Sequence, residues 1–194
     1  GAIIYDAMSL KTPQLLEDRK AIYSKLVFGE LPVSSWNKLI RRDFLKGNSI
    51  DFYEGVIHED VDFLYKLAEH VTSFAICPVI TYCYRVQREG SILSTTNDDR
   101  STQSRILVYN ACLDKKMEMP FRKLLTRSIF LRLIFVLQTA DVSHNLRYSF
   151  KTLCWRTVHE ASGMDGFWMG LYLRAPKFLK NRFYNLYSKK MKSL

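Results

Sequence analysis

The strongest constraint on the fold is a helical hydrophobic pattern that fills the second half of the chain. Apolar residues recur there every three or four positions, as in helices that bury one face. The longest apolar run, Ile129–Leu137, is interrupted by Arg132 and falls well short of the roughly 20 residues that cross a bilayer. The pattern predicts helices over residues 98–118, 120–140, 143–161 and 167–192, the last with a break near Pro176.

The first half has a mixed pattern of extended and helical segments. Residues 2–5 are a short apolar run compatible with a buried strand. Thr12 and Pro13 predict a helix start, with Thr12 as the cap and Pro13 at the first helical position. The β-branched and aromatic stretch at residues 71–85 predicts two strands joined near Pro78.

Two further helices are predicted between these segments, from residue 34 to residue 45 and from residue 59 to residue 71. Their predicted inner faces are Trp36, Leu39, Ile40, Phe44 and Leu45 in the first and Phe63, Leu64, Leu67 and His70 in the second. We therefore expect an α/β chain that is mostly helical, with a mixed part over residues 1–97 and a basic helical part over residues 98–194.

The net charge of +10 is confined to one end of the chain. Residues 1–119 hold 15 Lys and Arg against 16 Asp and Glu, whereas residues 120–194 hold 14 against 3. Such segregation favours an extended anionic partner, a nucleic acid or a lipid headgroup surface, over a buried acidic substrate.

The four cysteines and four histidines indicate no metal module. Cys77, Cys83, Cys112 and Cys154 are spaced too irregularly for a zinc module and are too few for a disulfide scaffold, so we expect reduced thiols in a cytoplasmic protein. The histidines at 58, 70, 144 and 159 show no shared ligand spacing, although His58 adjoins two acids that it could tune.

Three motifs follow one another in the first half: Trp36-Asn37-Lys38-Leu39, then Glu59-Asp60, then Tyr82-Cys83-Tyr84-Arg85-Val86-Gln87-Arg88-Glu89-Gly90-Ser91-Ile92. In this order and at these intervals they resemble the second half of family 2 glycosyltransferases, the inverting GT-A enzymes that build bacterial surface polysaccharides. The resemblance covers roughly residues 2–95. It implies the C-terminal part of a GT-A nucleotide-diphospho-sugar transferase fold, followed by a helical region.

The resemblance also implies that a donor-binding half is missing from these residues. In the family that half holds the nucleotide and a divalent metal, Mg or Mn, through an Asp-x-Asp motif. Asp60-Val61-Asp62 has the right letters, but it belongs to the Glu-Asp element at a predicted helix start, so we reject it as the metal motif. We accordingly expect no metal site in this chain and no transferase activity from these residues alone.

Inverting sugar transfer needs one carboxylate to take the proton of the acceptor hydroxyl. Adjacent residues at a helix start point about 100° apart, so Glu59 and Asp60 cannot both face one substrate oxygen. The resemblance assigns the base to Asp60 and a positioning role to Glu59. The structural alternative is that both acids, with Asp62, merely complement the helix dipole.

The resemblance assigns the departing diphosphate to a loop that carries Arg85, Arg88 and Ser91, whose side chains suit phosphate oxygens. Without that context, arginines in a loop are usually solvated. Trp36 is interpreted as a core residue, or alternatively as an aromatic face for the acceptor sugar. Lys38 either reaches the acceptor or pairs with an acid such as Asp60.

The C-terminal segment Leu171–Leu194 carries seven Lys and Arg and no acid, with apolar residues on one predicted helical face. It can lie on an anionic membrane or pack on the protein core. Nucleic acid is disfavoured, because the aromatic residues lie on the apolar face.

The resemblance, together with the basic C-terminal segment, implies a cytoplasmic enzyme, peripheral on the inner face of the membrane, that uses a nucleotide-sugar and a lipid-linked glycan acceptor. The alternative is a non-catalytic membrane-surface or scaffolding module.

Overall fold

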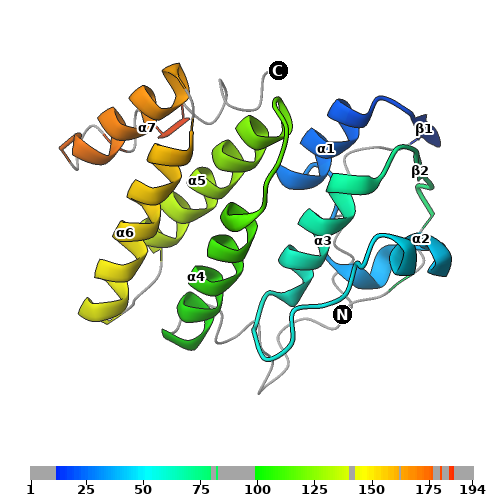
Figure 1. The fold of residues 1–194 in the computed structure, drawn as a ribbon, viewed down its shortest axis with the longest axis horizontal. Helices are drawn as coiled ribbons and strands as arrows, with labels where there is room; N and C mark the ends of the chain where they lie inside the picture. The colour runs from blue at the N-terminus through cyan, green and yellow to red at the C-terminus, as the bar shows by residue number, and fades with distance from the viewer. Residues whose placement is uncertain are drawn as a thin grey trace, which may run out of the picture. The chain divides into compact units, whose positions relative to one another are not determined.

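The computed structural model describes residues 12–79, 82, 99–139, 143–161, 163–176, 180, 184 and 185. The chain divides into two compact units, Gly1–Thr96 (unit 1) and Asn97–Leu194 (unit 2). The described residues are mostly helical and include one small two-stranded sheet (Figure 1). The expectation of an α/β, mostly helical chain is confirmed at this level.

The sheet of unit 1 joins two segments far apart in sequence. Strand β1 (Gln14–Leu16) pairs antiparallel with β2 (Phe74–Ile76), with Leu15 opposite Ala75. β2 is the first of the two strands expected in residues 71–85. The second strand and the N-terminal run at residues 2–5 lie outside the described residues.

The prediction of a helix start at Thr12 and Pro13 is wrong. The residues that follow form β1, and helix α1 (Arg19–Val27) begins only after Asp18. The Asp18 carboxylate accepts hydrogen bonds from the backbone N–H groups of Lys20 and Ala21, at 2.8 and 3.2 Å. Asp18 therefore supplies the cap, and the residues before it are free to pair as a strand.

The single helix expected between residues 34 and 45 is also wrong. The structure has a one-turn 3₁₀ helix, η1 (Ser35–Asn37), and a separate helix α2 (Arg42–Gly47). Between them Lys38 is extended, with φ −127° and ψ 137°. The expected helix end is confirmed, because α2 stops at Gly47 and Asn48 caps it.

The second helix predicted in the first half is confirmed as α3 (Glu59–His70), which packs against α1. It follows a turn at Glu54 and Gly55, where glycine accommodates a φ of 77°. Three of its four predicted inner residues are buried, but His70 at the last turn is exposed.

A compact apolar cluster holds α2 against α3. Ile50, Phe63 and Leu67 are buried in it, and the partly buried residues around them are Ile40, Phe44 and Leu45. Ile40, Phe44 and Leu45 thus pack inward as predicted, although the helix expected to present them is interrupted.

The described residues of unit 2 form four longer helices: α4 (Asp99–Asp114), α5 (Phe121–Thr139), α6 (His144–Glu160) and α7 (Met164–Arg174). The first three predicted helices of the second half are confirmed, and the fourth is confirmed for the part before Pro176, where α7 begins three residues earlier than expected. The last ends at Arg174, two residues before Pro176, because proline disfavours helical backbone in the residue that precedes it. Most of the remaining predicted helix lies outside the described residues.

Helix α6 packs against α4, α5 and α7 (Figure 1). Helix α5 has buried residues along most of its length. At the turn from α6 into α7, a Cβ atom on Gly166 would lie 2.7 Å from the Ala161 carbonyl oxygen, so a larger residue would force the backbone apart. Within the described ranges, no helix combines the length and the apolar character that crossing a membrane requires.

Candidate functional site

An exposed aromatic pair marks one face of unit 1. The rings of Trp36 on η1 and Tyr82 stack with centroids 4.3 Å apart and planes 28° apart. Trp36 is 48% exposed and Tyr82 is 49% exposed, so the pair presents flat apolar surface to solvent. The interpretation of Trp36 as a core residue is wrong, because the break after Asn37 keeps it out of the apolar cluster under α3.

Hydrogen bonds from Lys38 stabilise the loop that carries Trp36. Its Nζ donates to the carbonyl oxygens of Pro32 and Ser34, both at 2.6 Å, and to Asn37 Oδ1 at 2.9 Å. An ammonium group has three N–H donors, so these acceptors use all of them. Lys38 is therefore a positioning residue for η1, and its interactions tie it to the loop.

Lys38 also interacts electrostatically with Asp60 across the contact between η1 and α3. Burial lowers the pKa of Lys38 from 10.5 to about 8, although the negative charge of Asp60 acts in the opposite direction and raises it. Of the two roles expected for Lys38, electrostatic pairing with Asp60 is the one with a physical basis here. Asp60 therefore lies close to the loop that holds Trp36.

The start of α3 presents the two acids of the Glu-Asp motif. Glu59 is exposed and Asp60 is half-buried in the first turn, with Asp62 two positions further on. The residue before them, His58, has left-handed backbone with φ 74° and ψ 28° and makes no side-chain cap. Such backbone is uncommon for a residue with a Cβ, and it sets the direction in which the first turn of α3 leaves the loop.

Asp62 has a structural role. Its side chain is 3% exposed, and its Oδ2 lies 2.6 Å from Lys66 Nζ one turn along α3. The same Nζ donates to the Asp51 carbonyl oxygen at 2.8 Å, which ties α3 to the preceding segment. The rejection of Asp60-Val61-Asp62 as the metal motif stays a prediction.

Four of the predicted site residues thus lie on two segments that contact each other: Trp36 and Lys38 in and directly after η1, and Glu59 and Asp60 at the start of α3. Arg85, Arg88 and Ser91, the predicted diphosphate ligands, lie outside the described residues. Among the described side chains, no three of His, Cys, Asp or Glu gather closely enough to hold a metal ion. The divalent metal of the full-length enzyme stays a prediction.

Sequence reasoning gave no role to Tyr82, although it opens the third motif. The available signal was the residue type, because the first and third motifs each begin with an aromatic residue. Their stacking could not be foreseen, since it joins residues 46 positions apart through loops that have no periodic pattern.

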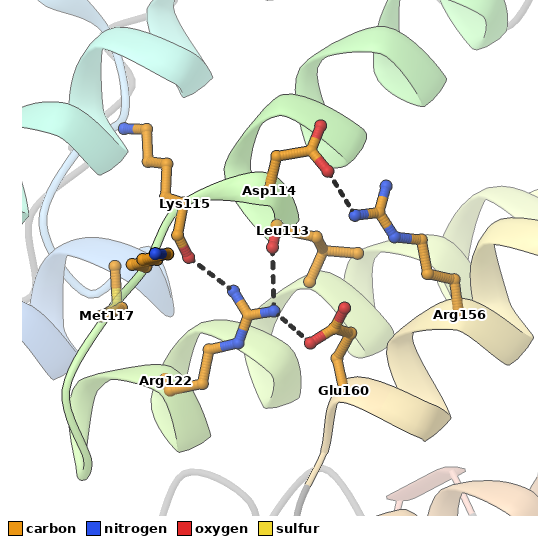
Figure 2. A pocket seen from close by; sticks show the side chains of 8 residues that line it. Leu113, Asp114, Lys115, Met117, Arg122, Arg156 and Glu160 are labelled. Atoms are coloured by element: carbon orange, nitrogen blue, oxygen red, sulfur yellow. Dashed lines mark hydrogen bonds and ion pairs between the residues drawn. The ribbon is translucent and has the colours of Figure 1, made fainter.

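In the described part of unit 2, a shallow, open hollow of about 440 Å³ lies beside the end of α4 (Figure 2). Figure 2 shows the guanidinium of Arg122 directed at the Leu113 and Lys115 carbonyl oxygens, 2.8 and 3.2 Å away, and at the Glu160 carboxylate. Arg156 pairs with Asp114 on the other side. Both arginines therefore have structural partners: Arg122 binds backbone carbonyls at the end of α4 and the Glu160 carboxylate, and Arg156 binds the Asp114 carboxylate.

Three of the four cysteines are described, and all three are free thiols. Cys112 and Cys154 are buried as expected for core thiols, whereas Cys77 is exposed. Burial raises the pKa of Cys154 to about 12, against a smaller opposing effect of the Lys180 charge. A thiol of that pKa stays protonated and is a poor nucleophile.

No family model matches this chain, and no curated protein or solved structure matches it. The candidate site therefore stands on its own geometry and chemistry.

Proposed function

We propose that this chain is the acceptor-side part of an inverting GT-A glycosyltransferase of family 2, which transfers a sugar from a nucleotide-sugar to a surface-glycan acceptor. The observation that carries the proposal is that Asp60, half-buried at the start of α3, interacts electrostatically with Lys38 in the loop that presents Trp36. A carboxylate can take the proton of an acceptor hydroxyl, and an exposed aromatic face can stack on a sugar ring.

In the proposed reaction the sugar ring of the acceptor stacks on one face of the Trp36 indole, and Tyr82 stacks on the other face of the indole. The Asp60 carboxylate takes the proton of the acceptor hydroxyl while the oxygen attacks the anomeric carbon of the donor. The bond from that carbon to the diphosphate breaks on the opposite face, and the diphosphate leaves with the bonding electrons. Glu59, one position away and exposed, is assigned to positioning the acceptor.

The proposal extends to groups outside the described residues. Arg85, Arg88 and Ser91 are assigned to the departing diphosphate, because guanidinium groups and a hydroxyl stabilise the developing negative charge. Donor binding, with Mg or Mn, is assigned to a separate half of the enzyme. The acceptor is proposed to be lipid-linked, in keeping with the basic segment Leu171–Leu194.

Saccharide binding tests the acceptor side directly. Titration calorimetry with a panel of mono- and oligosaccharides should find at least one ligand for the wild-type chain. Trp36→Ala should weaken that ligand about tenfold, because stacking on an aromatic face is lost. Trp36→Phe should weaken it less, since it keeps a ring at this position.

Tyr148→Ala is the matched control, because Tyr148 is an exposed aromatic residue of unit 2, outside the proposed site. It should leave the affinity unchanged. Binding of the best saccharide with equal affinity by wild type and Trp36→Ala, or no binding by the wild-type chain, would contradict the proposed acceptor site.

A further inference from the structure

Helix α7 is apolar on two opposite sides. One side packs into unit 2 through buried residues that include Met169 and Tyr172. The other side carries Met164, Phe167 and Leu171, which are 65%, 61% and 44% exposed. Their spacing of three and four residues places them on a single helical face, here called the α7 stripe. Large apolar side chains gathered in this way usually mark an interaction surface.

The only acid of α7, Asp165, lies on the buried side of the helix and not on the stripe. Asp165 is buried and accepts two hydrogen bonds from Arg127 on α5, from Nε at 2.7 Å and from Nη2 at 2.9 Å. The ion pair fixes the rotation of α7 on the unit, and it leaves the stripe without a negative charge. Trp168 borders the stripe, with its ring edge-on to Phe167 at 5.5 Å.

Positive charge follows the stripe along the chain. Arg174 closes α7 and lies over the Trp155 ring, with its guanidinium carbon 5.0 Å from the ring centroid. Six more Lys and Arg follow before Leu194, and no acid lies after Asp165. A second copy of this chain would bring like charge against like charge, whereas an anionic lipid surface complements it.

We propose that the α7 stripe docks on an anionic lipid surface, with Met164, Phe167 and Leu171 entering the boundary between headgroups and acyl chains. This proposal is independent of sugar transfer. It adds an apolar anchor within a packed helix to the basic segment at residues 171–194. Surface helices of this kind combine burial of apolar side chains with attraction of nearby cations to acidic headgroups.

Vesicle co-sedimentation of the full chain tests the proposal. The wild type should bind phosphatidylcholine vesicles that contain phosphatidylglycerol, and bind pure phosphatidylcholine vesicles much less. Phe167→Ser with Leu171→Ser should lower the partition coefficient about tenfold or more, because two apolar side chains no longer leave water. Added salt should weaken wild-type binding, since it screens the cations.

Leu107→Ser is the matched control, because Leu107 on α4 is 45% exposed and thus close to Leu171 in exposure. It should bind vesicles as the wild type does. Equal binding by the stripe double variant would assign binding to the basic segment and overturn the role of α7. Sedimentation equilibrium tests whether a second copy of the chain covers the stripe instead. A wild-type dimer, a monomeric double variant and no vesicle binding by either protein would also overturn the proposal.

A second readout needs no change in the stripe. Vesicles that carry brominated acyl chains should quench the tryptophan fluorescence of the bound wild type, and Trp168→Phe should remove most of that quenching. Full quenching in Trp168→Phe would contradict docking through α7. All these measurements omit sugars, so their failure would leave the acceptor-site proposal unaffected.

Discussion

In unit 1, Trp36 and Tyr82 stack at the surface, and the half-buried Asp60 interacts with Lys38 in the loop that carries Trp36. In unit 2, by contrast, Arg122, Arg127 and Arg156 are paired with carboxylates, and Arg122 also binds the end of α4. Both described acids after residue 119, Glu160 and Asp165, are paired with an arginine. The unit that carries the net positive charge is therefore not the unit that contains the candidate site. The unit rich in cations uses many of them to hold helices together, and the near-neutral unit exposes the groups suited to chemistry.

The largest expected effect on stability is in unit 2. Arg127→Met should lower the free energy of unfolding by about 3–5 kcal/mol, because it leaves the Asp165 carboxylate buried without its bidentate partner. Replacing both residues, Arg127→Met with Asp165→Leu, should recover most of that loss. Urea unfolding of the three proteins measures this. A single variant as stable as the wild type would show that the pair does not hold α7 in place.

The corresponding change in unit 1 should cost less. Lys38→Met removes the donor of three hydrogen bonds in the η1 loop, and we expect a loss of about 1–2 kcal/mol, because each acceptor is partly accessible to water. Urea unfolding again gives the value, with Lys20→Met on the exposed side of α1 as the control expected to change little. A loss as large as that of Arg127→Met would remove the contrast between the units.

The pH dependence of stability should report Lys38. Its folded-state pKa is about 8, below the ordinary value of 10.5, so between these values the unfolded chain holds more protons than the folded chain. The contribution of Lys38 to the free energy of unfolding therefore rises as the pH increases from about 8 to 10.5. Comparison of wild type with Lys38→Met over this range isolates it; parallel curves would contradict the burial of this amine.

The smallest effect concerns the thiols. Iodoacetamide at neutral pH should modify Cys77 in the native protein well before Cys112 and Cys154, because burial blocks access to the latter two. For Cys154 it also keeps the thiol protonated. Peptide-resolved mass spectrometry follows the three sites. Equal modification rates would show that the core of unit 2 opens as readily as the surface of unit 1.

Local patterns predicted the helices of unit 2 and α3, because each is long enough for its apolar period to be visible and its ends carry recognisable signals. Arg174 and Pro176 fix the end of α7 in this way. β1 was missed because its stability comes from pairing with β2, about 60 residues away. No local pattern around Gln14 reveals such a partner.

The candidate site was predictable as a set of residue types, and its geometry was not. The motifs that contain Trp36, Lys38 and Asp60 pointed to one site. The loop that exposes Trp36 depends on where the Lys38 amine finds its acceptors, and periodicity favoured a continuous helix instead. The Arg127–Asp165 pair was equally hidden, because its members lie 38 residues apart on different helices.

The most direct test of the central claim is sugar transfer by the gene product that contains this sequence, compared with its Asp60→Asn variant. Loss of the general base should lower transfer by about 10²–10⁴-fold, while donor binding and the free energy of unfolding stay nearly unchanged. Asp43→Asn, which alters an exposed acid in the first turn of α2, is the matched control and should transfer at the wild-type rate. Wild-type turnover by Asp60→Asn would contradict the assignment of this site.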